Sequence, residues 1–100
     1  MPAVSRVGDM STGHGCFPPT AMVQSPIGKT FFNGIKPGVV DSGCQFADHT
    51  CGTVTHTQAE RFVSSGAGKT FIEGKAAGRI GDNVGDGDAI AEGSPNSFIE

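Results

Sequence analysis

The sequence predicts an all-β domain of short β-hairpins, arranged as three quasi-equivalent repeats that close into a ring. The first observation is that residues 61–82 match the segment forty positions earlier without a gap, so that Gly68-Lys69-Thr70 corresponds to Gly28-Lys29-Thr30. The second is that half of the segment recurs twenty-seven positions later, where the chain stops. The third is that the missing half stands at the N-terminus.

The third repeat is assembled from both ends of the chain. If the last residue is counted as continuing into the first, Arg79 and Asp82 correspond to Arg6 and Asp9 without an insertion. A repeat that cannot bury its own apolar face must stack on its neighbours, and three copies are about the minimum that can do so. We therefore expect one pseudo-three-fold domain over residues 1–100, with its termini side by side.

Short apolar runs bounded by turn residues predict the strands. In chain order, the expected strands are residues 3–9, 21–25, 29–33, 61–65, 69–73 and 76–80. Connecting turns are expected at residues 26–28, 66–68 and 93–96. Asn33-Gly34 is the strongest hairpin signal, because this dipeptide favours the tight turn between paired strands. No helix longer than one turn is expected; the helical pattern at 58–61 conflicts with the repeat, which assigns 61–65 to a strand.

Composition favours a small fold with many turns. The chain has 16 glycines, 7 phenylalanines and neither tryptophan nor tyrosine, so we expect the core to use phenylalanine together with valine, isoleucine and alanine. A domain of 100 residues buries a limited share of its surface. A crosslink or a bound metal would therefore stabilise it.

Charge and hydropathy argue against several function classes. The net charge of -3 and the pI near 5.5 leave no basic stripe, so a nucleic-acid partner is not expected. Residues 1–6 lack the features of a signal peptide, and no apolar run is long enough to span a membrane, so the chain is expected to be made in the cytoplasm. The 3 cysteines leave at least one thiol unpaired, which favours a reducing compartment or a metal over a disulfide framework.

The histidines and cysteines all lie in the two loops between the repeats and predict a metal site. Structural zinc takes four nitrogen or sulfur ligands in a tetrahedron. The candidate ligands are His14 from the first loop and His49, Cys51 and His56 from the second. A site closed by four protein ligands would be structural, because catalysis needs an open position for water.

Other interpretations of these residues stay open at this point. Cys44 or Cys16 could supply the thiol ligand in place of Cys51. The histidines could be unrelated surface residues and the cysteines small buried ones. A Cys44–Cys51 disulfide is a further alternative, although it would leave the histidines unexplained.

Two further motifs do not meet the requirements of known sites. Gly68-Lys69-Thr70 lacks the glycine that a phosphate-binding loop needs five positions earlier, where Val63 stands, and the triplet recurs within the repeat. Asp82, Asp86 and Asp88 lack the spacing and the terminal glutamate of a calcium loop and are expected in a solvated turn. No catalytic arrangement has a recognisable signature, so an enzyme is not expected.

Several motifs, taken in order over essentially the whole chain, resemble the PAAR-repeat family. They are Gly8-Asp9, Thr12-Gly13-His14-Gly15, Pro18-Pro19, the repeated Phe-x-Asn/Glu-Gly turn and the run Lys-Ala-Ala-Gly-Arg-Ile-Gly-Asp at 75–82. The resemblance implies a small cone or pyramid with a zinc ion near its apex, held by three histidines and one cysteine. These correspond here to His14, His49, His56 and Cys51. The chain departs from the family in residues 35–40, which replace an arginine-containing form, and in the extra Cys44.

The resemblance also implies a function, since members of this family cap the trimeric β-helical spike of type VI secretion systems and contractile phage tails. We expect a non-enzymatic piercing tip, monomeric in isolation, that binds a trimeric VgrG-like or phage tail spike protein through a flat apolar base. Such a tip contacts a target membrane transiently and is delivered outside or into a target cell. The alternatives are an adaptor that attaches separate effector proteins to the spike, and a small zinc hydrolase.

Overall fold

The structure, a computed structural model, describes residues 2–85 and 87–99 of the chain. Within these residues, the regular structure consists of four two-stranded antiparallel sheets and one 3-10 turn, η1 (Gln58–Glu60). The pairs are β1 (Met22–Gln24) with β2 (Gln45–Phe46), β3 (His49–Cys51) with β4 (Val54–His56), β5 (Phe71–Ile72) with β6 (Lys75–Ala76), and β7 (Asn83–Val84) with β8 (Asp88–Ala89). The predicted all-β fold without a long helix is confirmed.

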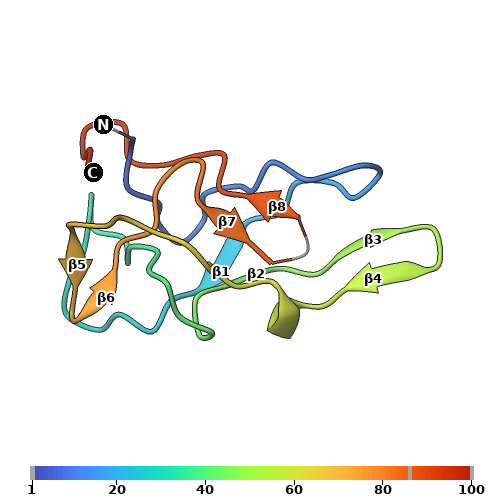
Figure 1. Ribbon diagram of the computed structural model, residues 1–100, viewed down its shortest axis with the longest axis horizontal. Helices are drawn as coiled ribbons and strands as arrows, with labels where there is room; N and C mark the ends of the chain where they lie inside the picture. Colours follow the sequence, from blue (N-terminus) through green and yellow to red (C-terminus); the bar gives the residue numbers. More distant parts are fainter. Residues whose placement is uncertain (1, 86, 100) are drawn as a thin grey trace.

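The molecule is elongated, with extents of 38 × 23 × 23 Å, and its two ends differ (Figure 1). The β5–β6 hairpin and both chain termini lie at one end, which we call the base end. The β3–β4 hairpin projects at the other end, beside the loop of residues 12–19, and we call this the tip end. The remaining strand pairs lie between the two ends.

The two termini pair with each other. Ala3 and Phe98 form an antiparallel bridge, and the N–H of Ile99 donates to the carbonyl of Pro2 at 2.9 Å. Figure 1 shows the N and C ends next to each other at the base end. The prediction that the termini lie side by side is confirmed.

Two tight turns at equivalent positions of the repeat also lie at the base end. Phe32 and Ile35 exchange backbone hydrogen bonds of 2.8 and 3.1 Å across Asn33-Gly34, and β5 and β6 join across Glu73-Gly74. Asn33 and Glu73 have φ of 57° and 51°, and the following glycines have 76° and 83°. Positive φ at both central residues defines the primed turn that matches strand twist, so the Asn33-Gly34 hairpin is confirmed.

The hairpin expected across residues 26–28 is wrong, and so is its repeat copy. β1 pairs with β2 instead, and the N–H of Met22 also donates to the carbonyl of Asp9 at 3.0 Å. Val63, in the second copy, bridges Val84. Segments distant in sequence occupy the edges of these strands, so the next segment of the chain cannot pair there.

A ring of three backbone hydrogen bonds joins three equivalent positions of the repeat. Ser5 N–H donates to the carbonyl of Gly78 at 2.9 Å, Gly78 N–H to Gly38 at 2.8 Å, and Gly38 N–H to Ser5 at 2.9 Å. At position 38 this close approach requires glycine. A Cβ on Gly38 would collide with the Ser5 hydroxyl and stand 2.6 Å from Met22 Cε.

The apolar core lies between this ring and the strand pairs. Its buried members are Val4, Met22, Ile27, Val39, Cys44, Phe46, Val63, Ala67, Ile72, Ala77, Val84 and Ile90. The expectation that phenylalanine builds much of the core is wrong. Phe46 is its one fully buried phenylalanine, whereas Phe31, Phe71 and Phe98 are 53%, 61% and 50% exposed. Valine, isoleucine and alanine supply most of the core, as expected.

Candidate metal centre

Three histidines converge at the tip end. His49 and His56 stand opposite each other in the β3–β4 hairpin, where directly paired residues project from the same face. His14 comes from the facing loop, which turns back so that His14 N–H donates to the carbonyl of Phe17 at 3.1 Å. This turn needs a glycine at 13, because a Cβ there would lie 2.7 Å from the Phe17 carbonyl oxygen, and φ is 72°.

The imidazole nitrogens lie close enough to bind one metal ion. One ring nitrogen of each histidine lies within 4.8 Å of the others, and His49 Nε2 is 3.0 Å from His56 Nδ1. Zinc binds imidazole nitrogen at about 2.0–2.1 Å, which places two nitrogens of one tetrahedron about 3.3 Å apart. The pair formed by His49 and His56 is close to this spacing, and the third nitrogen lies within 4.8 Å of both.

His14 provides the clearest sign that a ligand belongs there. Both of its ring nitrogens are buried, and neither hydrogen bonds to any group in the described part of the chain. A buried polar atom without a partner is costly, so such groups call for an explanation such as a bound ion. A metal ion among the three rings would satisfy one of these nitrogens.

His49 is held in the form that binds metals. Its Nδ1 lies 3.0 Å from the carbonyl oxygen of Pro18, which can only accept, so Nδ1 carries the proton and Nε2 presents its lone pair to the cluster. Burial lowers the pKa of His49, and the charge of Arg61 lowers it further, although the Pro18 bond opposes both. The side chain, 2% exposed, is therefore a neutral imidazole at pH 7.

Phe17 packs against the cluster. Its ring centroid lies 4.0 Å from that of His56 in a stacked arrangement, 4.7 Å from that of His49 and 4.9 Å from that of His14. The four rings restrict one another's orientation. Phe17 thereby keeps water from one side of the imidazoles, a role that the sequence analysis did not assign to it.

A buried ion pair braces the two segments that carry the histidines. Arg61 and Asp88 form a salt bridge in which both side chains are fully buried. Arg61 also donates to Thr20 Oγ1 and to the carbonyl of Ala47, and Asp88 accepts from Thr12 Oγ1 at 2.8 Å. Because Thr12 and Ala47 each stand two residues before a histidine, the pair fixes both segments in place.

Asp88 was expected in a solvated turn, and this prediction is wrong. Burial alone would raise its pKa, but hydrogen bonds from Ser11 and Thr12 and the charge of Arg61 outweigh it and hold the pKa below its usual range. Asp82 accepts two hydrogen bonds from the Arg79 guanidinium, at 3.0 Å each. Asp86 lies outside the described residues.

The cysteines depart from the expected arrangement. Cys51 is bonded to Cys16 in a disulfide with a Cα–Cα distance of 5.5 Å. A disulfide sulfur is not a thiolate, so Cys51 cannot serve as the predicted zinc ligand in this form. The preference for a metal or a reducing compartment over a disulfide is therefore wrong for Cys16 and Cys51, whereas the expected unpaired thiol is present as Cys44.

Cys44 takes no part in the metal centre. It is fully buried in the core, where its thiol contacts Met22 Sδ at 3.7 Å. Burial raises its pKa to about 11. Both the Cys44–Cys51 disulfide and Cys44 as the reserve ligand are therefore wrong.

Compared with known proteins, the chain matches no family model and no curated protein. Among residues 2–85 and 87–99, no helix has the length and apolar character needed to cross a bilayer. The same residues contain no detectable pocket.

Proposed function

We propose that this protein is a PAAR-repeat tip, a non-enzymatic and metal-stabilised cap for a trimeric β-helical spike. The observation that carries the proposal is the set of three exposed phenylalanines. Phe31, Phe71 and Phe98 occupy the same position in the three repeats and are 53%, 61% and 50% exposed. Large apolar side chains exposed together indicate an interaction surface.

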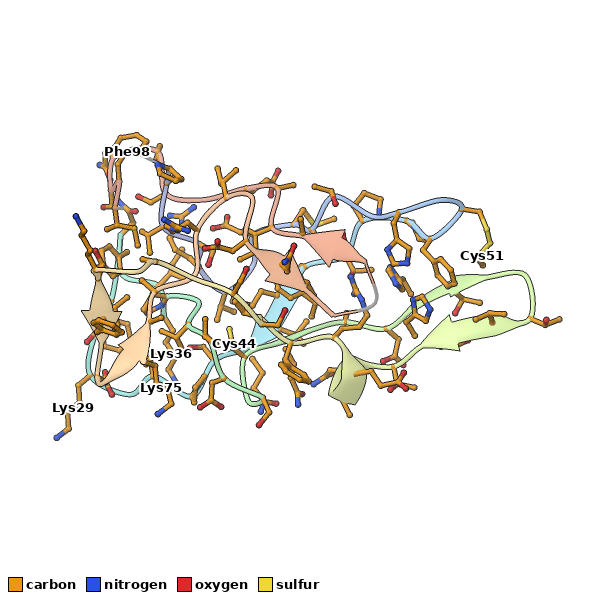
Figure 2. The ribbon with its side chains drawn as sticks, in the orientation of Figure 1. Lys29, Lys36, Cys44, Cys51, Lys75 and Phe98 are labelled. Carbon is orange, nitrogen blue, oxygen red and sulfur yellow. A yellow bond between two sulfur atoms is a disulfide. The ribbon has the colours of Figure 1, made fainter. Side chains whose placement is uncertain are left out.

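These side chains belong to the base end. β5 begins with Phe71, and Figure 2 shows Phe98 at this same end of the molecule. Phe31 adjoins the Asn33-Gly34 turn, the repeat counterpart of the β5–β6 turn. A flat trimeric partner would present three equivalent sites, and one chain with three equivalent phenylalanines can fill them together.

Contacts between the three repeats, which we call the first, second and third arm in the order of the sequence analysis, support a three-fold arrangement of the base. Lys29 N–H and Thr30 Oγ1 donate to Glu73 Oε2 at 3.0 and 3.1 Å, which links the first arm to the second. Asn33 Nδ2 donates to Asn96 Oδ1 at 3.0 Å, which links the third arm to the first. Each contact joins the same two repeat positions of neighbouring arms. The ring of Ser5, Gly38 and Gly78 likewise contains one residue from each of the three arms.

The tip end fits the proposed stabilisation by a metal ion. A tapering end has too little volume for an apolar core, so a metal that ties distant loops together replaces packing there. We assign zinc to the cluster of His14, His49 and His56, because neutral imidazoles in a tetrahedral arrangement suit this ion. When bound, the ion would hold the loop at 12–19 against the β3–β4 hairpin.

The proposal also implies a working cycle. The chain is made in the cytoplasm, docks on the spike through its base and meets the target membrane with its tip. Capping also covers the open strand edges at the end of the spike, which would otherwise pair with other chains. Puncture then requires a rigid tip and no chemical step.

The test is binding to the trimeric β-helical spike protein encoded by the same genome. Phe71→Ser should weaken binding by about 2 kcal/mol, roughly thirtyfold, as expected for an aromatic anchor. Val54→Ser is the matched control, because Val54 is 52% exposed but lies on β4 at the tip end, and it should leave binding unchanged. Absence of binding to any spike protein, or equal losses in both variants, would contradict the proposal.

A further inference from the structure

The same two segments carry both the histidine cluster and the disulfide. His14-Gly15-Cys16 and His49-Thr50-Cys51 share one spacing, a histidine followed two residues later by a cysteine. In a strand, residues two apart project from the same face, so Cys51 lies on the face of β3 that carries His49. Figure 2 shows the sulfur bond of Cys51 beside the β3–β4 hairpin.

We infer that Cys16 and Cys51 are a redox-active pair: its reduction supplies the Cys51 thiolate to the three-histidine cluster as the fourth metal ligand, and its oxidation withdraws that ligand. The inference rests on the zinc site of the proposed function and extends it. Three histidines alone leave one tetrahedral position open, and thiolate is a preferred zinc ligand. A disulfide sulfur cannot fill that position.

The two forms are connected by a balanced exchange. A small thiol reductant attacks the disulfide and forms a mixed disulfide, and a second molecule of the reductant releases it. Cys16 and Cys51 leave as free thiols, and the two reductant molecules leave as their disulfide. Zinc then displaces the proton of the Cys51 thiol, which passes to solvent, and the zinc–sulfur bond forms.

The location of the pair suits this exchange. Cys16 is exposed and Cys51 is half-buried, so a small thiol can reach the bond. Cys44, by contrast, is fully buried in the core, and burial makes a thiol inert. Cys44 is therefore an internal control for the reactivity of Cys16 and Cys51 toward thiols.

Either form ties the same parts of the tip together. The disulfide joins the loop at 12–19 to β3 directly, across a sequence separation of 35. In the reduced form, zinc would join His14 of that loop to His49, Cys51 and His56 of the hairpin. The tip would thus be crosslinked by metal in a reducing compartment and by the disulfide in an oxidising one, without refolding.

The test compares zinc affinity in the oxidised and the phosphine-reduced protein, measured by competition with a chromophoric chelator at one pH. Reduction should tighten zinc binding at least about tenfold, since even indirect partners of a zinc ligand change affinity by about 10- to 100-fold. Cobalt added as a probe should show thiolate-to-metal absorption in the reduced form and none in the oxidised form.

Variants assign the effect to individual sulfurs. Cys16→Ser should bind zinc tightly with or without oxidant, because Cys51 then keeps its thiol. Cys51→Ser should bind weakly in both states, Cys44→Ser should behave like the unchanged chain, and His49→Ala should lose zinc in every state.

The outcomes separate the two proposals. Equal zinc affinity in the oxidised and reduced protein overturns the redox inference and leaves the zinc site standing. Loss of affinity in Cys16→Ser, with Cys51→Ser unaffected, overturns the assignment of Cys51. No zinc binding in any state overturns the metal centre itself, and none of these results depends on spike binding.

Discussion

The backbone is fixed by different interactions at the base end and at the tip end. At the base end, the backbone hydrogen bonds that join Ser5, Gly38 and Gly78, together with a close-packed core, hold the two tight turns in place. At the tip end, residues 12–20 and 47–57 contribute no member of the core cluster. Directional interactions replace packing there: three imidazoles, a buried ion pair and a disulfide.

This difference has a physical cause. The apolar contribution to stability grows with the area removed from water, and a narrow end removes little. Hydrogen bonds, ion pairs and metal ligands act over single contacts and need no large volume. The stability of the base end should therefore depend most on the shape of its side chains. The stability of the tip end should depend most on its charged groups and on its metal and disulfide bonds.

The largest expected effect comes from the buried ion pair of Arg61 and Asp88 at the tip end. Arg61→Met leaves Asp88 charged, buried and unpaired, and should lower the free energy of unfolding by about 3–5 kcal/mol in a urea titration. Lys75→Met is the control. Its partner Asp41 stands 3.7 Å away in a pair that is 39% and 28% exposed, and such pairs contribute about 1 kcal/mol or less.

A double substitution sharpens this test. Arg61→Met with Asp88→Leu removes both charges, and apolar replacement of a buried pair is often close to neutral. The double variant should therefore recover much of the loss seen for Arg61→Met. A double variant that is as unstable as the single one would show that the unpaired charge is not the cause.

Shape is tested at the base end by Gly38→Ala. The added methyl group collides with the Ser5 hydroxyl inside the hydrogen-bonded ring, which should cost about 1–3 kcal/mol of unfolding free energy. Gly28→Ala is the matched control, because no atom lies within 4 Å of its Cβ position and its φ is not positive. It should be neutral or add up to about 1 kcal/mol. Equal effects at both sites would argue against a tightly packed ring.

The features of the fold that could be predicted from the sequence are those that follow from the internal repeat or from local turn residues. The paired termini and the Asn33-Gly34 turn follow from the repeat and from local turn chemistry. The partner of β1 does not, because Gly8, Asp9 and β2 lie far from it in sequence. Local patterns cannot show that a strand's edges are already occupied.

The candidate site was predictable to a similar extent. His14, His49 and His56 stood out because they are all of the chain's histidines and lie in two loops. Arg61 and Asp88 were missed, since a single arginine and a single aspartate in different segments have no local signature. The Cys16–Cys51 pair was missed as well, because a disulfide depends on the distance between two Cβ atoms, which local sequence does not show.

The smallest expected effect is a pH dependence at the tip end. The pKa of Asp88 is lower in the folded chain than its unfolded value of about 3.9. The ionised form therefore stabilises the fold above about pH 4, and this contribution is lost as the pH falls through the lowered folded pKa.

Urea unfolding of the metal-free protein between about pH 5 and pH 2 measures this contribution, with the pH range set by the carboxyl pKa. Asp88→Asn should flatten the decline in stability with falling pH, because it removes the carboxyl whose pKa is lowered by folding. Identical slopes in the variant and the unchanged chain would place the acid sensitivity elsewhere.

The most direct test of the central claim is the stoichiometry of the proposed complex with a trimeric spike, measured by native mass spectrometry. One chain that presents three equivalent phenylalanines should bind with one copy per spike trimer. Three copies per trimer, or no complex, would contradict the account.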